Sequence, residues 1–340
     1  MRVEVSLRAT PTSEVAVTAA ELERAGAAAV CDSESSRDPL LTMAMAAVTT
    51  ERIGLATAVT IAFPRSPMVV AYGARMLHDQ TGGRFRLGLG TQVQRHMEHR
   101  FGVPWDSPGP RLRDYVQALR AIWASWETGG PLAHAGPYYS MDLMTPEFSP
   151  GPAPHGRVAV DVAAVNPYNL ELAAELCDGV RLHVFNTPGY VRDVVRPRLA
   201  AGAERAGRDL TGFEVHGGGF VATGPTAAEV EQAREQARRR VAFYGSTLAY
   251  RPVLEHHGWG ALRDELRELV RQERWDDLSA AVPDEVLDEF CTAATYAELA
   301  PALRRRWAGL VTTVQLPAPQ HPYSAQWDGF AEACAAVEEL

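Results

Sequence analysis

The residues best suited to chemistry in this chain stand at the ends of apolar, strand-like runs. Gly88-Leu89-Gly90 closes one such run, and two glycines there would let a flat ring or a phosphate group approach the backbone closely. Glu34 follows another run, where its carboxylate could donate a proton or accept a hydrogen bond that anchors a ring. A solvent-exposed turn carboxylate is the alternative for Glu34. Beyond the glycines, Gln92 and His96 could face a ring or a substrate, and Arg95 could contact an acidic group.

His96 and His99 flank Glu98, a spacing compatible with a metal site. The sequence has no H-E-x-x-H pattern and no evident third ligand, so we predict no metal centre. A metal-dependent hydrolase built on these residues is an alternative that a stoichiometric bound ion would support. The glycine run is not a dinucleotide-binding fingerprint, because Val93 stands where the third glycine would be.

The composition excludes several kinds of chemistry and partner. All 33 basic residues are arginine, so no lysine can form a Schiff base, bind phosphate in a Walker A loop or act as a general base. The net charge of −9, without a basic block, argues against nucleic acid and anionic membranes as partners. We expect neither a membrane span nor a signal peptide. Four scattered cysteines without C-x-x-C spacing predict buried, reduced thiols in a cytoplasmic protein.

The elements that must position these residues share one kind of boundary. Four times an apolar run ends in a polar turn that is closed by a capping residue and a proline, at Asp38-Pro39, Ser66-Pro67, Asn166-Pro167 and Thr187-Pro188. A side-chain acceptor at the N-cap followed by proline at the first helical position is typical of a strand-to-helix turn. The repetition predicts a parallel sheet covered by helices, in which chemistry collects at these turns.

Eight strand-like runs with helical patterns between them predict an α/β fold, a closed (β/α)8 TIM-type barrel, with an open doubly wound sheet as the alternative. The predicted strands are Arg2–Leu7, Ala27–Asp32, Ile53–Ala62, Arg84–Gly90, Val158–Ala164, Val180–Phe185, Phe213–Thr223 and Leu310–Leu316. The predicted helices are Ser13–Ala25, Pro39–Thr49, Pro67–Gln80, Arg111–Trp126, Pro167–Cys177, Pro188–Ala206 and Ala325–Glu339.

We expect a single domain that spans residues 1–340. Two of its segments are longer than the connections of the strand–helix repeat require. We expect inserts at about 129–156 and 225–300 to form walls over the mouth at the carboxyl ends of the strands; additional surface helices are the alternative. Tyr138 and Tyr139 of the first insert could donate phenol protons or simply pack.

The stretch Leu55–Trp105 resembles the bacterial luciferase-like superfamily, and within it the actinobacterial coenzyme F420-dependent oxidoreductases. The motifs that carry the resemblance are Ala56-Thr57-Ala58-Val59, Arg65-Ser66-Pro67, Gly82–Gly90, Phe101–Trp105, Leu143–Pro146, Ala163-Ala164 and Ala242–Thr247. They occur in order through nearly the whole chain.

The resemblance implies a barrel that holds a deazaflavin at the carboxyl ends of its strands, with a non-prolyl cis peptide at Ala58–Val59 behind the ring. The turns after the fifth and sixth strands resemble the family's phosphate-binding region. Many relatives have Asp-His after the second strand, whereas this chain has Ser33-Glu34, so that histidine's role cannot be transferred. We therefore take Glu34 and His96 as catalytic candidates. The candidate cofactor-binding residues are Ala58, Val59, Gly88, Leu89, Gly90, Thr91, Gln92, Ala163, Ala164, Val165, Asn166, His183 and Thr187.

The function implied is an F420H2-dependent oxidoreductase that moves a hydride between deazaflavin C5 and a small organic, natural-product or modified-peptide substrate. Reduction of an activated C=C or C=N bond and oxidation of an alcohol both stay open. An FMNH2-dependent monooxygenase keeps the fold and changes the cofactor, and a cofactorless binding barrel is a further alternative. Relatives usually pair through outer barrel helices, so the resemblance implies a homodimer. The apolar faces of Pro39–Thr49 and Pro67–Gln80 are compatible with such a contact and equally with packing on the sheet.

Overall fold

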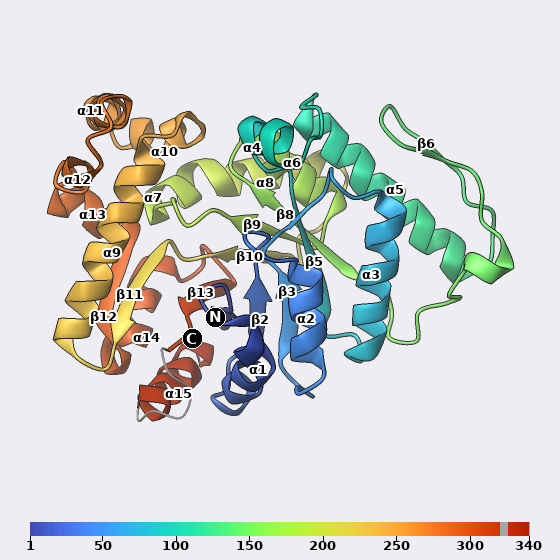
Figure 1. Cartoon of the computed structure of the whole chain (residues 1–340), viewed down its shortest axis with the longest axis horizontal. Helices are drawn as coiled ribbons and strands as arrows, with labels where there is room; N and C mark the ends of the chain where they lie inside the picture. The colour runs from blue at the N-terminus through green and yellow to red at the C-terminus, as the bar shows by residue number, and fades with distance from the viewer. Residues whose placement is uncertain (320–325, 340) are drawn as a thin grey trace.

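A computed structural model describes residues 1–319 and 326–339 and shows a closed barrel of parallel strands surrounded by helices (Figure 1). The sheet order is β3-β2-β1-β13-β10-β9-β8-β5, and a pairing between β3 and β5 closes the ring. This closed ring of eight parallel strands confirms the predicted barrel and excludes the open sheet. The strands are β1 (Arg2–Ser6), β2 (Ala29–Asp32), β3 (Gly54–Thr57), β5 (Phe85–Gly90), β8 (Ala159–Ala164), β9 (Gly179–Leu182), β10 (Glu214–Gly217) and β13 (Thr313–Pro317).

The helices of the repeat lie outside the strands, and all four cap-proline boundaries are confirmed. Asp38, Ser66, Asn166 and Thr187 each accept a hydrogen bond from a first-turn backbone N–H, with proline at the start of the helix. The helices of the repeat are α1 (Val15–Arg24), α2 (Pro39–Ala47), α3 (Pro67–Gln80), α5 (Pro108–Thr128), α6 (Pro167–Leu176) and α15 (Gln326–Glu338), together with the continuous run α7 (Pro188–Tyr190), η3 (Val191–Val195) and α8 (Arg196–Arg205).

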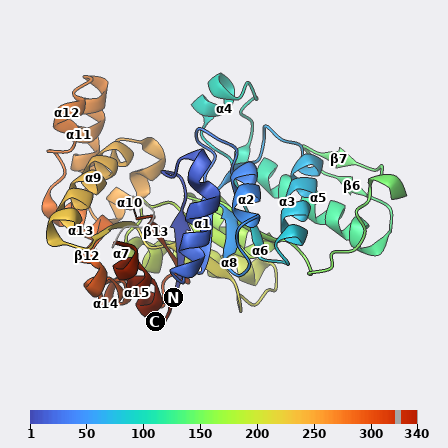
Figure 2. The same ribbon diagram turned by 60° about the horizontal axis from the view of Figure 1, so that its bottom comes forward.

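The two long segments lie at opposite sides of the barrel (Figures 1 and 2). Residues 129–156 form an extended loop with β6 (His134–Ala135), β7 (Ser140–Met141) and the turn η2 (Pro146–Phe148). Residues 225–300 hold α9 (Ala227–Gly245), η4 (Leu248–Tyr250), α10 (Arg251–His256), α11 (Gly260–Arg271), α12 (Trp275–Leu278), α13 (Asp284–Phe290) and β12 (Cys291–Thr295), and α14 (Tyr296–Trp307) follows.

Some boundaries differ from the prediction, and the predicted strand Ile53–Ala62 is divided into β3 and a short strand, β4 (Thr60–Ile61). The expected strand Phe213–Thr223 is two strands, β10 and β11 (Phe220–Gly224), because Gly218 and Gly219 at φ +107° and +66° turn the chain out of the barrel. β11 then pairs with β12, a strand inside the stretch that we expected to be helical. The first residue of the predicted helix Ala325–Glu339 is outside the described residues.

The packing separates an apolar layer from a polar barrel interior. Along β5, Phe85, Leu87 and Leu89 are fully buried in the core between strands and helices, so Arg86, Gly88 and Gly90 face the interior. All four cysteines are buried and unpaired, as predicted. Among the described helices, none combines the length and hydropathy that a membrane span requires.

Candidate active site

The peptide bond Ala58–Val59 is cis, as the resemblance implied, and it lies between β3 and the short strand β4 (Thr60–Ile61). Neighbouring strand ends hold this bulge. The Ala58 N–H donates to the Asp32 carbonyl at 2.7 Å, and the Val59 carbonyl accepts from the Glu34 N–H at 3.1 Å. On the other side, the Ala62 N–H donates to the Gly90 carbonyl at 3.0 Å. The ends of β2, β3 and β5 therefore form one hydrogen-bonded rim.

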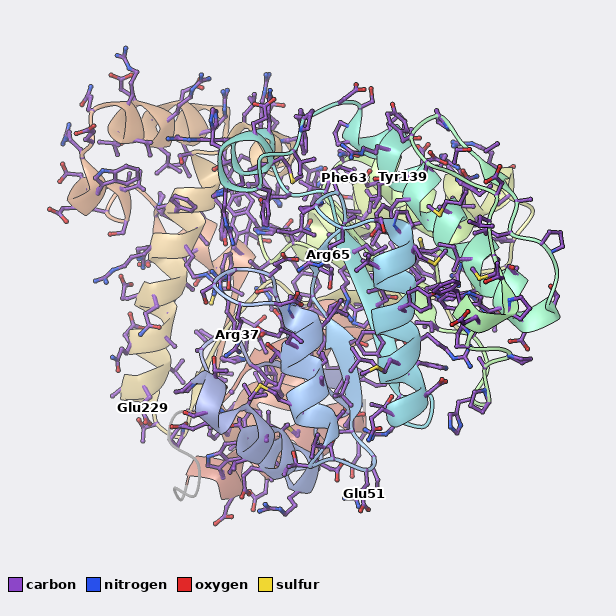
Figure 3. The ribbon with its side chains drawn as sticks, turned by 45° about the vertical axis from the view of Figure 1, so that its right-hand side comes forward. Arg37, Glu51, Phe63, Arg65, Tyr139 and Glu229 are labelled. Carbon is purple, nitrogen blue, oxygen red and sulfur yellow. The ribbon has the colours of Figure 1, made fainter. Side chains whose placement is uncertain are left out.

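The Glu34 side chain braces this rim. Its Oε2 accepts from the Ile61 N–H at 2.8 Å, and Arg65 Nη1 donates to both carboxylate oxygens at 2.9 and 2.8 Å. Arg65 also pairs with Asp38 at 2.7 Å, which links the bulge to the cap of α2 (Figure 3). The Glu34 side chain is only 8% exposed, so the exposed-turn alternative is wrong. An ion-paired carboxylate is an acceptor, and the geometry suits an anchor better than a proton donor.

A second arginine ties the ends of β1 and β2 together. Arg37 donates to the Asp32 carboxylate at 2.7 Å and to the carbonyls of Leu7 and Thr10 at 2.6 and 2.7 Å. Figure 3 shows Arg37 and Arg65 on the same side of the barrel. Both arginines fix the rim through bonds to loops that are distant in sequence.

The glycines of β5 make room for protein atoms, which corrects the reason given for them above. A Cβ atom on Gly88 would overlap the Thr57 carbonyl and lie 2.9 Å from Arg181 Nε, so Gly88 faces the filled barrel interior. Thr57 Oγ1 bonds both the N–H and the carbonyl of Gly88. A Cβ on Gly90 would lie 2.5 Å from Val59 Cγ2. Gly90 thus admits the cis bulge to the rim, whereas Gly88 admits an arginine below it.

The structure brings some predicted cofactor residues together and separates others. Ala163 lies beside Gly90 and Val59 at the mouth, since its Cβ is 3.7 Å from the position of a Cβ on Gly90. The buried side chain of Leu89 points away from the mouth into the layer under the helices, and Ala164 is also buried. Leu89 could reach a mouth ligand only through its backbone, which corrects any expectation of a side-chain contact.

Asn166 and Thr187 act as helix caps at the carboxyl ends of β8 and β9. Asn166 Oδ1 accepts from the Asn169 N–H at 2.9 Å, and Thr187 Oγ1 accepts from the Tyr190 N–H at 3.1 Å. Thr187 Oγ1 also lies 2.7 Å from His257 Nε2. Val165 precedes the first cap and is partly buried. Each cap leaves further first-turn N–H groups at a helix end that attracts anions.

Residues 91–100 follow β5 directly and extend from the rim as a loop and a short helix. Gln92 adopts φ +61°, and its side chain accepts from the Val93 N–H at 3.0 Å, while Thr91 Oγ1 bonds the Gln92 carbonyl. The helix α4 (Gln94–Arg100) follows, with only Met97 buried, and projects from the barrel (Figure 2). His96 and Arg95 are exposed on it, so His96 is a weaker catalytic candidate than its position in the sequence indicated.

No group of three or more His, Cys, Asp or Glu side chains is placed to hold a metal within residues 1–319 and 326–339. His96, Glu98 and His99 are all exposed on α4 and do not gather around a common point. The alternative of a metal-dependent hydrolase therefore gains no support from the described residues.

An ion network fills the barrel below the mouth. Arg181 pairs with Glu4 at 2.8 Å and with Asp161 at 3.2 Å, and Arg86 pairs with Asp161 at 2.5 Å. His216 Nε2 lies 3.3 Å from Asp161. Burial raises the pKa of Asp161, but His216 and the two arginines outweigh it, so that this pKa lies well below the ordinary value. The interior is a charged floor, and a ligand can enter only above it.

A cavity of about 530 Å³ lies between the first residues of α3 and the 129–156 segment. Tyr138 and Tyr139 line it, and the Tyr139 hydroxyl accepts from Arg111 Nε at 3.2 Å. The Tyr139 ring packs edge-on against Tyr115 at 5.3 Å, and the Arg111 guanidinium lies over the Phe63 ring. Phe63 and Tyr139 are labelled in Figure 3. Tyr139 therefore both packs and forms a hydrogen bond.

Sequence reasoning gave no site role to Arg37 and Arg65, nor to Tyr244 and Tyr250, which pack on His183. Arg65 stood within a quoted motif, and both tyrosines stood in the long insert. Two signals were available: Arg65 and Tyr244 lie in quoted motifs, and Arg37 stands three residues after Glu34 in the same turn.

The fold and the rim define a TIM-type barrel enzyme of the luciferase-like oxidoreductase class, with its site at the carboxyl ends of the strands. The chain belongs to the luciferase-like monooxygenase family, whose sequence model matches residues 2–313.

Three relatives illustrate the range of the family. An uncharacterised protein of Mycobacterium tuberculosis is 41% identical over 296 residues, 87% of each chain. Another protein of that organism, provisionally named a coenzyme F420-dependent oxidoreductase, is 30% identical over 254 residues, 71% of this chain and 72% of the relative. The structure of the F420-dependent tetrahydromethanopterin reductase from Methanopyrus kandleri superposes with a TM-score of 0.80 at 19% identity, covering 99% of this chain and 98% of that one.

Proposed function

We propose that this protein is a coenzyme F420-dependent oxidoreductase that transfers a hydride between deazaflavin C5 and a small organic or natural-product substrate. The reaction is reduction of an activated C=C or C=N bond, or oxidation of an alcohol. The observation that carries the proposal is the braced rim, where Val59, Gly90 and Ala163 meet beside two capped helix ends. The F420-dependent relatives support the choice of cofactor.

The residues at the mouth fit a flat ring with an anionic tail. The small side chains of Val59 and Ala163, with Gly90 between them, offer a surface against which a ring can lie. The helix ends at Asn166 and Thr187 would take phosphate oxygens through backbone N–H groups, which suits a chain without lysine. Bound F420 supplies two-electron hydride chemistry, and the protein supplies position and a proton.

In this proposal Glu34 is a positioning residue. Its carboxylate holds Ile61 and Arg65 and so fixes the backbone that follows Val59. His96 stays a candidate for the proton donor, although it is exposed on α4. Exclusion of water from the reacting atoms would fall to α4 and the two long segments.

An FMN-dependent monooxygenase is the second candidate, and the description of the matching family favours it. Fluorescence titration of the purified protein with F420 and with FMN separates the two. We expect F420 to bind and its visible absorbance to fall on reduction when a substrate alcohol is supplied. Tight FMN binding together with no F420 binding would refute the proposal.

We also propose that the protein forms a homodimer through α2 and α3, and that the partner is a second copy of the chain. These adjacent helices expose the apolar side chains of Leu41, Val69 and Met76 at 68%, 61% and 72%, which a partner surface would cover. Light scattering should give twice the chain mass, and the double variant L41E/M76E should give the mass of one chain. An unchanged mass in that variant would place the contact elsewhere.

A further inference from the structure

His183 follows β9 directly, two residues beyond Arg181. Because side chains alternate along a strand, His183 extends the row that Arg181 begins on the inner face of the barrel, one level nearer the mouth. Two rings from the 225–300 segment hold the imidazole. Tyr250 stacks on it with centroids 4.5 Å apart and an interplanar angle of 25°, and Tyr244 meets it edge-on at 4.5 Å. The ring plane is therefore fixed from two sides.

The hydrogen bonding of His183 assigns its proton. The Phe185 N–H donates to His183 Nδ1 at 3.1 Å, and a backbone N–H can only donate. Nδ1 is therefore the acceptor, and the neutral imidazole carries its proton on Nε2. Within the described residues nothing accepts from Nε2, and this atom is not among the buried unpartnered ones, so it keeps contact with solvent.

The surroundings of His183 keep it uncharged near neutral pH. Burial and, to a smaller extent, the Arg240 charge lower the pKa of His183 to about 4. The other titratable groups against the ring are the phenols of Tyr244 and Tyr250, and burial raises the pKa of Tyr250 above its ordinary value. His183 thus carries an oriented, neutral Nε2–H donor whose state does not change between pH 6 and 9.

We propose that His183 is a binding residue that donates its Nε2–H to an uncharged oxygen of the ring cofactor, a ring carbonyl or a ribityl hydroxyl. Tyr244 and Tyr250 are positioning residues that hold the imidazole for this bond. A neutral donor has no Coulombic preference for a phosphate, and the capped helix ends at Asn166 and Thr187 are better placed for that group. The inference rests on one part of the proposed function, namely that a ring cofactor binds in the mouth.

The test is equilibrium binding measured by fluorescence, with two pairs of ligands. Each pair contains a cofactor and its phosphate-free form: F420 with its deazaflavin-ribityl fragment, and FMN with riboflavin. H183F keeps the aromatic stack and removes the donor, whereas H183Q returns an N–H near the Nε2 position. H155F makes the same substitution at an exposed histidine beside Gly83, before β5 begins, and is the matched control. Thermal melting of each variant checks the fold.

For the pair that binds, H183F should weaken the binding of the cofactor and of its phosphate-free form by the same factor. We expect about tenfold, the value of one good hydrogen bond. H183Q should restore affinity to within about threefold, H155F should leave it unchanged, and the ratios should hold from pH 6 to 9. Unchanged affinity in H183F, a loss confined to the phosphate-bearing ligand, or equal losses in H183F and H183Q would overturn the inference. Should H183F melt early, H183M replaces it as the variant without a donor, and the same criteria apply to H183M and H183Q.

The same titrations separate this inference from the proposed function. Binding of FMN and riboflavin without F420 refutes F420 dependence, yet the H183F and H183Q pattern on those ligands would still support His183 as the donor. Binding of F420 with no effect of H183F leaves the proposed function intact and refutes the inference. Failure of all four ligands to bind the wild-type protein refutes both.

Discussion

Replacing Arg181 with methionine tests whether the ion network is the floor of the site. Arg181 donates to Glu4 Oε2 at 2.8 Å and Oε1 at 3.1 Å, and to Asp161 at 3.2 Å, with all three side chains at most 7% exposed. In R181M, Asp161 keeps its pair with Arg86. Glu4 is left with His216, whose Nδ1 is 3.8 Å away, so one buried carboxylate loses its arginine.

The size of the effect follows from that unpaired charge. Removing one partner of a buried ion pair costs about 3–5 kcal/mol, a large part of the roughly 5–15 kcal/mol that holds a domain folded. Methionine fills much of the arginine stem's volume, so the loss is mainly electrostatic. The double variant E4Q/R181M removes both charges and should recover part of the loss, about 1–3 kcal/mol relative to R181M.

The pKa of Glu4 determines whether the stability penalty of R181M grows or shrinks as the pH falls. In the wild-type protein, burial raises the pKa of Glu4, but Arg181 and His216 outweigh it and bring it from 4.5 to about 2. This lowered pKa contributes stability above pH 4.5 that is lost as the pH falls toward 2. In R181M burial dominates and the pKa rises above 4.5, so acidification from pH 7 to 5 should reduce the penalty of the substitution.

Urea unfolding followed by circular dichroism at pH 7 and pH 5 measures the penalty of R181M against wild type. A penalty under 1 kcal/mol at pH 7, or one that grows between pH 7 and 5, would refute the reasoning. Unfolding of E4Q alone provides the control, because it leaves Arg181 with Asp161.

Three further predictions concern the mouth. E34Q keeps the acceptor for Ile61, so it should retain turnover within about tenfold and lose about 1–3 kcal/mol of stability; a loss of turnover of several thousandfold would instead make Glu34 the acid. G90A should displace Val59, weaken cofactor binding and cost about 1–3 kcal/mol of stability. The control is G260A, whose added Cβ has no atom within 4 Å, so neither binding nor stability should change. Equal behaviour of the two variants would contradict the packing argument. T187A and S66A each remove one helix cap, worth about 1 kcal/mol on unfolding, but only T187A should weaken the phosphate-bearing cofactor in titrations; equal affinities would remove Thr187 from the site.

Local chemistry allowed much of the fold to be predicted. Asp38, Ser66, Asn166 and Thr187 could be recognised as caps because the cap and its proline act within a few residues. The cis bond at Ala58–Val59 came from the resemblance, since no local propensity indicates one.

The contacts across the barrel could not be predicted, because they depend on register. Gly88 was interpreted as space for a ligand, and the structure fills that space with Arg181 from a strand two positions away. Glu34 was interpreted from its own turn, yet its partner Arg65 comes from the loop after the next strand. The division of Phe213–Thr223 depended on a pairing of β11 with β12 that only the folded chain provides. Long-range electrostatics and strand partners carry no short-range signal in the sequence.

Arg181 and His183 set the depth of the site together, although only His183 was a candidate from the sequence. Arg181 lies under Gly88 and holds two carboxylates, so the barrel is closed at the level of Gly88. His183 follows Arg181 by two residues toward the mouth, and two tyrosines from the insert fix its ring. A ring that rests on the Val59, Gly90 and Ala163 surface would therefore sit above a charged floor with a neutral donor at its edge. The charges below the ring are paired with each other, since Arg181 and Arg86 bind the carboxylates of Glu4 and Asp161. The hydrogen bond that orients the ring would come from His183 at its edge.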